Sequence, residues 1–220
     1  MRITRWVVGP LRTNCYVVES RGEALIIDAG WHEDLEDLLR YISEKSLDVK
    51  SVIATHGHFD HVAGVSVIKR VYNTRFLINE RDLLIAARAP EIARSYLGLE
   101  IPEIPRPDSF ISEGDEMRVG DVSMRVLEVP GHSPGSVALY IERASDTGRP
   151  VLFSGDTLFR DSIGRTDIPG ASPDRMRESL RRIASLPLET IVLPGHGSAT
   201  TLGREIERNL YLRQILGLES

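Results

Sequence analysis

One short stretch constrains this chain more than any other: residues 54–61 read Ala-Thr-His-Gly-His-Phe-Asp-His and follow directly after an apolar run. It crowds three of the six histidines and one carboxylate into six residues. His56 and His58 are two positions apart, so in an extended segment both side chains project to the same side and can hold one ion. Asp60 and His61, where the chain turns, then face a second ion. Imidazole and carboxylate suit zinc, iron or manganese. Because no cysteine lies nearby in the sequence, the site is not expected to be a thiolate-bound structural zinc finger.

A polar surface loop that happens to be rich in histidine would also explain this stretch taken alone. The rest of the chain argues against that alternative, because three further residues of ligand type each follow a strand-like run: His132, Asp156 and His196. Five of the six histidines therefore lie just past such runs, which a solvated loop does not require. The pattern predicts a metal centre.

Length and composition are those of an ordinary globular chain, with 220 residues, 41% hydrophobic, 27% charged and a formal net charge of -5. We expect one domain, residues 1–220, with a substantial core. The acidic balance argues against a nucleic-acid partner. No apolar segment follows Met1-Arg2 and no apolar run approaches the ~20 residues needed to cross a bilayer, so we expect a cytoplasmic protein without a membrane partner. Cys15, the single cysteine, is expected to be a small buried strand residue and not a nucleophile.

Hydrophobic periodicity and turn residues divide the chain into alternating strands and helices. The strands are predicted at residues 3–8, 15–19, 24–28, 49–55, 74–79, 116–119, 122–129, 136–142, 150–154 and 190–193. The helices are predicted at residues 33–46, 62–72, 80–98 with a break at Pro90, 173 onwards after a Ser172 cap, and 203–216. These elements form two similar halves, and two sheets packed face to face with helices on both outer sides would bury them all.

Three features have more than one interpretation at this stage. Asp28 ends a strand and suits either an outer partner of a metal-bound histidine or a turn. His32 lies outside the strand-end pattern and is interpreted as a surface residue. The segment around Pro102, Pro105 and Pro107 is expected to be a plain surface connection, with a wall of the substrate site as the alternative.

In their order and spacing, four motifs resemble the metallo-β-lactamase superfamily, at residues 55–61, 130–132, 155–156 and 194–197. Within that superfamily, residues 154–159, 164–167 and 200–203 are similar to the short glyoxalase II type enzymes, the hydroxyacylglutathione hydrolases. The match covers nearly the whole chain. It implies a fold of the α/β (α+β) class, a four-layer αββα sandwich of two mixed β-sheets with helices on both outer faces.

The resemblance also implies the ligand set. One metal would take His56, His58 and His132, the other would take Asp60, His61 and His196, and Asp156 would bridge the pair. Two Zn²⁺ ions per chain are expected, with iron or manganese as alternatives.

Charge counting indicates the chemistry of such a centre. Two divalent ions bring four positive charges, while Asp60, Asp156 and a bridging hydroxide remove three, which leaves a centre suited to a developing oxyanion. We expect hydroxide to attack a thioester carbonyl, with Asp60 orienting the hydroxide as well as binding metal. A thiolate is a good leaving group, since free thiols have a pKa of about 8.5, so no separate general acid is required.

The expected partner is a small thioester, most simply an anionic one of the S-acylglutathione type. Arg165 matches the basic position of the family's loop after the bridging aspartate and is predicted to pair with a substrate carboxylate, with a structural salt bridge as the alternative. The longer glyoxalase II enzymes carry a helical carboxy-terminal extension that helps hold glutathione, whereas here 23 residues follow Gly197. The rival functions are a persulfide dioxygenase with one iron and a lactone or ester hydrolase of the same superfamily.

Overall fold

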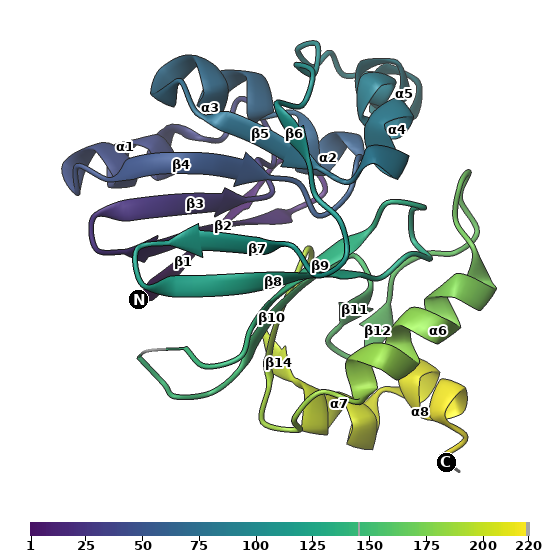
Figure 1. Ribbon diagram of the computed structural model, residues 1–220. Helices are drawn as coiled ribbons and strands as arrows, with labels where there is room; N and C mark the ends of the chain where they lie inside the picture. Colours follow the sequence, from purple (N-terminus) through teal and green to yellow (C-terminus); the bar gives the residue numbers. More distant parts are fainter. Residues whose placement is uncertain (145, 219–220) are drawn as a thin grey trace.

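Two six-stranded sheets form the centre of the molecule, and they pack face to face between two outer layers of helices (Figure 1). The computed structural model describes residues 1–144 and 146–218. The first sheet consists, in spatial order, of β1 (Arg2–Val8), β2 (Thr13–Ser20), β3 (Glu23–Ile27), β4 (Asp48–Ile53), β5 (Arg75–Ile78) and β6 (Ser109–Phe110). Its first three strands are antiparallel, and β3 to β6 run parallel.

The second sheet is also mixed. Its strands, in spatial order, are β14 (Thr200–Thr201), β13 (Ile191–Pro194), β10 (Val151–Gly155), β9 (Val137–Ile141), β8 (Val122–Glu128) and β7 (Glu116–Val119). Only β10 and β13 pair in parallel among its described strands. A separate two-stranded hairpin is formed by β11 (Leu158–Phe159) and β12 (Ser162–Ile163).

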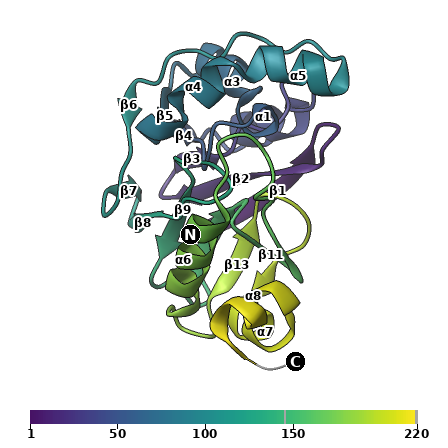
Figure 2. The same ribbon diagram turned by 90° about the vertical axis from the view of Figure 1, so that its right-hand side faces the viewer.

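Helices cover the outer face of each sheet. The first sheet is covered by α1 (Glu36–Glu44), α2 (Phe59–Val62), α3 (Val65–Tyr72), α4 (Leu83–Ala87) and α5 (Ala89–Leu97). The second is covered by α6 (Pro173–Ala184), α7 (Leu202–Arg208) and α8 (Leu210–Leu216), which lie together at the opposite side of the molecule from α1 and α3 (Figures 1 and 2). The αββα order predicted from the sequence is confirmed. No helix among the described residues is long and apolar enough to span a bilayer.

The alternation of apolar residues along the strands explains the layering. Along β3, Ile26 faces the core under α1 and α3, whereas its neighbours Leu25 and Ile27 face the core between the sheets. Successive strand residues point to opposite faces, so a fully apolar strand must be covered on both sides. A third cluster, around Leu152 and Leu180, lies between the second sheet and α6 to α8.

Several element bounds differ from the sequence predictions. The helix predicted at residues 62–72 begins only at Val65, and a short helix that the sequence did not reveal, α2, holds Phe59–Val62. The short strands β6, β11, β12 and β14 were also missed, because two-residue strands carry no periodic signal. The closing helix is divided at Asn209, whose extended backbone ends α7 and whose side chain accepts a hydrogen bond from Leu212 N to cap α8.

Other predicted boundaries agree with the structure. The helix at residues 80–98 restarts at α5 with Pro90 in its first turn. Ser172 caps α6 by accepting a hydrogen bond from the amide of Arg175, and Pro173 opens the helix. The helix predicted at residues 33–46 is shorter, because α1 starts at Glu36 without a side-chain cap. Cys15 is buried in β2, as expected.

Candidate metal centre

The seven predicted ligand side chains meet at one edge of the sandwich, where strand carboxyl ends open into loops. His56 and His58 follow β4, whose arrow points to this edge in Figure 1, and Figure 2 views the molecule from that side. The other five come from α2 and from the loops after β8, β10 and β13: Asp60, His61, His132, Asp156 and His196.

Two triads can each hold a metal ion. The first contains His56, His58 and His132, and the second contains Asp60, His61 and His196. Within each triad, one ligand atom per residue lies within 4.8 Å of the others. The triads are those implied by the family resemblance, and the short helix α2 is what turns Asp60 and His61 away from the first triad towards the second.

Asp156 lies between the triads. Its Oδ2 is 3.5 Å from His132 Nε2 and 3.4 Å from His196 Nε2, and its Oδ1 is 3.5 Å from His61 Nε2. One carboxylate therefore faces both groups of nitrogens, which is the position that a bridging ligand needs.

The hydrogen-bonding pattern fits metal ions. Thr55 Oγ1 donates its single proton to Asp28 Oδ2 over 2.9 Å, so its oxygen accepts from His56 Nδ1 at 3.1 Å. His56 Nε2 therefore carries a lone pair, and this buried atom has no hydrogen-bond partner among the described residues. Asp156 Oδ1 is likewise buried and has no hydrogen-bond partner among the described residues. Buried polar atoms without partners are costly, and a cation coordinated by both would remove that cost.

Further contacts orient the rings of His132, His196 and His61. His132 Nδ1 donates to the backbone oxygen of Arg165 at 3.0 Å, and His196 Nδ1 donates to that of Leu11 at 3.0 Å. Asp28 Oδ2 lies 3.0 Å from His61 Nδ1. These partners fix the rings so that Nε2 points into the centre, as the outer partners of metal-bound histidines do. Of the two interpretations of Asp28, the partner role agrees with this geometry.

The carboxylates are held as well. Thr13 Oγ1 donates to Asp60 Oδ2 over 2.7 Å, which ties the ligand to the start of β2. Burial acts to raise the pKa of Asp60, but the charges of His61 and His196 outweigh it and lower that pKa. The pKa of Asp156 is lowered for the same reasons. Both side chains are therefore ionised and ready to bind cations.

Four of the site's histidines have shifted pKa values in the metal-free chain, two lowered and two raised. Burial lowers the pKa of His56, and burial together with His132 lowers the pKa of His58 to about 4. Burial acts to lower the pKa of His61 too, but Asp28, Asp60 and Asp156 raise it to about 9. Burial has the same tendency at His196, where hydrogen bonds to Asp156 and Asp60 raise the pKa to about 11.

Gly195, directly before His196, packs so closely against Asp156 and His61 that only glycine fits there. A Cβ added to Gly195 would lie 2.1 Å from Asp156 Oδ1 and 2.8 Å from His61 Cε1. Any side chain at this position would therefore displace ligands of the second triad, which explains the Pro-Gly-His-Gly sequence there.

Asp82 supports the site and was not anticipated from the sequence. Its carboxylate, fully buried, accepts hydrogen bonds from Gly57 N at 2.8 Å, Gly135 N at 2.6 Å and Ser133 Oγ at 2.6 Å. It thereby joins the loop of His56 and His58 to the loop of His132. Nothing in the local sequence distinguishes Asp82 from a solvated acid at a helix start.

Arg165 lies at the rim of the centre. Its carbonyl holds His132, while its exposed guanidinium donates from Nε and Nη2 to Asp167 over 2.9 and 3.0 Å. The role of Arg165 in substrate binding stays a prediction. His32 is more buried than expected, with 16% of its side chain exposed, and it belongs to neither triad.

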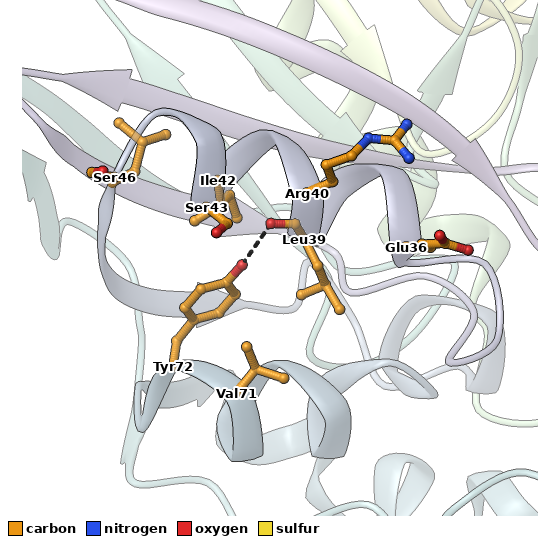
Figure 3. Close-up of a pocket in the computed structure, with 9 residues that line it drawn as sticks. Glu36, Leu39, Arg40, Ile42, Ser43, Ser46, Val71 and Tyr72 are labelled. Atoms are coloured by element: carbon orange, nitrogen blue, oxygen red, sulfur yellow. Dashed lines mark hydrogen bonds between the residues drawn. The ribbon is translucent and has the colours of Figure 1, made fainter.

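A hollow of about 590 Å³ lies elsewhere, between α1 and α3 (Figure 3). It is crossed by a hydrogen bond from the Tyr72 hydroxyl to the carbonyl oxygen of Leu39 at 3.1 Å. Ser46 and Leu47 in its lining precede β4, whereas His56 follows β4, so the hollow sits at the opposite edge of the sheet. Its lining residues include no histidine, and it is not part of the metal centre.

Comparison with known proteins agrees with this geometry. The family model described as the metallo-beta-lactamase superfamily matches residues 8–196. A hydroxyacylglutathione hydrolase, GloC, from Haemophilus influenzae is 33% identical over 209 residues, which cover 93% of this chain and 95% of the relative.

Two solved structures are similar over nearly their whole length. TTHA1623 in a di-iron-bound form superposes with a TM-score of 0.84 at 39% identity, covering 94% of this chain and 99% of that one. The BLEG-1 B3 metallo-beta-lactamase superposes with a TM-score of 0.86 at 32% identity, covering 96% and 99%.

Proposed function

The chain belongs to the metallo-β-lactamase superfamily of metal-dependent hydrolases, and from this premise we propose that it hydrolyses thioesters of the S-acylglutathione type with two metal ions bound. The observation that carries the proposal is the position of Asp156 between two complete triads. A single-metal enzyme would need only one of them. The likeness to a hydroxyacylglutathione hydrolase supports the thioester as substrate.

The residues present fit zinc, iron or manganese, and the neighbour with two irons supports a pair of ions without fixing the metal. Bound at these triads, divalent ions supply Lewis acidity for a carbonyl oxygen and lower the pKa of water from 15.7 towards 7. All five histidines have a nitrogen directed into the centre: His56, His58, His61, His132 and His196.

The chain's own contribution is positioning. Thr13 fixes Oδ2 of Asp60, so the carboxylate is held at the centre, where we propose that it orients the attacking water. Asp28 and the carbonyls of Leu11 and Arg165 hold three of the imidazole rings in place. The thiolate departs unaided, so the absence of a dedicated acid from the proposed set is consistent with a thioester.

The centre is partly open to solvent at His196 of the second triad. His196 has 26% of its side chain exposed, the aromatic ring of Phe159 lies 6.0 Å from its ring, and Leu11 is partly exposed beside it. An apolar rim of this kind suits the carbon chain of an acyl or thiol group. We propose a small, anionic thioester as the partner, in the cytoplasm.

The test is a substrate panel on the zinc- and iron-loaded protein: S-lactoylglutathione, other thioesters, lactones, a β-lactam, and glutathione persulfide with oxygen uptake. We expect thioester cleavage without oxygen consumption. Persulfide-dependent oxygen uptake, or β-lactam cleavage without thioester cleavage, would overturn the proposal in favour of a rival member of the superfamily.

A further inference from the structure

The guanidinium of Arg165 is already engaged by a carboxylate of the chain itself. Asp167, two residues along the same loop, takes Nε and Nη2 of Arg165 in a bidentate pair at 2.9 and 3.0 Å. This is the geometry with which arginine binds a substrate carboxylate. Asp167 therefore occupies the position that an anionic ligand of Arg165 would take.

Tyr96, on α5, also acts on this guanidinium. Asp167 first and Tyr96 second raise the pKa of Arg165 further above its usual range. The ring of Tyr96 lies 6.4 Å from that of Phe59, which directly precedes Asp60.

The loop that carries Arg165 lies against two of the predicted metal ligands, His132 and Asp156. The carbonyl of Arg165 accepts from His132, and a Cβ on the preceding Gly164 would meet the backbone oxygen of Asp156. The backbone of this loop therefore adjoins both the first triad and the bridging carboxylate. The side chain of Arg165 is 59% exposed and that of Asp167 is 71% exposed, so a solute can reach both.

We propose that Asp167 is a specificity-determining residue: it is a resident carboxylate that competes with a carboxylate-bearing thioester for Arg165. This inference rests on the proposed thioester hydrolysis. The pair has no net charge, so it attracts a second anion weakly, and a carboxylate that binds the Nε–Nη2 edge of Arg165 must displace Asp167. A thioester without a carboxylate at this position meets no such competition. Asp167 thereby reduces the factor by which the site prefers anionic thioesters to neutral ones.

Two thioesters that differ only in a terminal carboxylate or carboxamide on the thiol part test the proposal. For Asp167→Asn, KM for the carboxylate should fall about two- to fivefold, the worth of an exposed ion pair, while KM for the carboxamide stays constant. The fall should vanish in the Arg165→Gln background. As a matched control, Glu178→Gln removes an equally exposed carboxylate that pairs with Arg175 on α6 at 3.1 Å, and it should change neither KM.

A binding measurement separates this inference from the proposed function. Thioethers with the same two ends cannot be hydrolysed, and their Kd for the metal-loaded variants should follow the pattern expected for KM. If the wild-type protein cleaves no thioester, the proposed function fails while the Kd values still decide the role of Asp167. A higher KM or Kd for the carboxylate in Asp167→Asn would mean that Asp167 positions Arg165, and the proposal would be overturned. The proposal would also be overturned if Asp167→Asn changed KM or Kd equally for the carboxylate and the carboxamide. The same holds if KM or Kd for the carboxylate still fell in the Arg165→Gln background.

Discussion

Replacing Asp28 by asparagine should weaken the second metal site while preserving the fold. Asp28 Oδ1 accepts from Thr55 N at 2.7 Å, and Oδ2 faces His61 Nδ1 at 3.0 Å. An asparagine must keep its oxygen towards the amide of Thr55, so its NH₂ group would face His61 Nδ1. Two donors cannot pair, and His61 would have to move its proton to Nε2, which removes its metal-binding lone pair.

The expected magnitude follows from the role of such partners. Loss of an outer hydrogen-bond partner costs roughly 10- to 100-fold in metal affinity, or about 1.4 to 2.7 kcal/mol. The loss should fall on the second metal, since His61 belongs to the second triad. The Thr55 hydroxyl, which orients His56 of the first triad, can donate instead to the retained oxygen at the Oδ1 position, 3.1 Å away. Asparagine has nearly the volume of aspartate, so packing around this buried side chain should be retained.

Competition with a chromophoric chelator measures both affinities. We expect the first zinc ion to bind Asp28→Asn as it binds the wild type, the second to bind 10- to 100-fold more weakly, and excess zinc to restore turnover. Asp34→Asn is the matched control, because Asp34 also accepts from a backbone amide, that of Gly9 at 2.8 Å, outside both triads. An unchanged second affinity in Asp28→Asn would refute the assigned role.

Three further predictions concern the centre and its support. Asp156→Ala should lose at least one metal and nearly all hydrolysis while the circular dichroism spectrum stays native; two retained metals with normal turnover would contradict the bridging role. In the metal-free chain the pKa values of His61 and His196 are about 9 and about 11, so both rings are protonated at pH 7. Binding of the second metal at pH 7 should therefore release up to about two protons, and its affinity should increase as pH rises towards 9. Calorimetry in buffers of different ionisation enthalpy measures this, and a proton-free second step would be inconsistent with it. Asp82→Ala leaves three donors without their acceptor and should lower the free energy of unfolding by about 3 kcal/mol, or Tm by about 6–12 °C; a shift under 2 °C would mean that Asp82 does not hold the two loops together.

Much of the fold was accessible from the sequence because its strands are strongly apolar. The alternation along β3, or the Ser172-Pro173 start of α6, is a local signal that the structure bears out. The short helix α2 and the two-residue strands were not accessible. Their residues adopt these conformations because tertiary contacts hold them, as when Asp60 accepts a hydrogen bond from Thr13, 47 positions away.

The predicted ligand residues could be identified from the sequence for a different reason: they come after strand ends, and the sheets bring those ends together. The residues that orient these side chains have no comparable signal in the sequence. Leu11 acts through its carbonyl oxygen, which any residue possesses, and Asp82 acts through amides more than 20 positions away. Tyr96 lies on α5, far from Arg165 in the chain, so its effect on the pKa of Arg165 arises only in the folded structure.

The central claim is that two metal ions, held by two triads and joined by Asp156, perform hydrolysis. Its most direct test is to titrate zinc or iron into metal-free protein while following thioester cleavage and oxygen uptake together. We predict that turnover rises with the second equivalent, that it reaches its plateau at two metals per chain, and that no oxygen is consumed. Full activity at one iron per chain, accompanied by oxygen uptake with a persulfide, would contradict the claim.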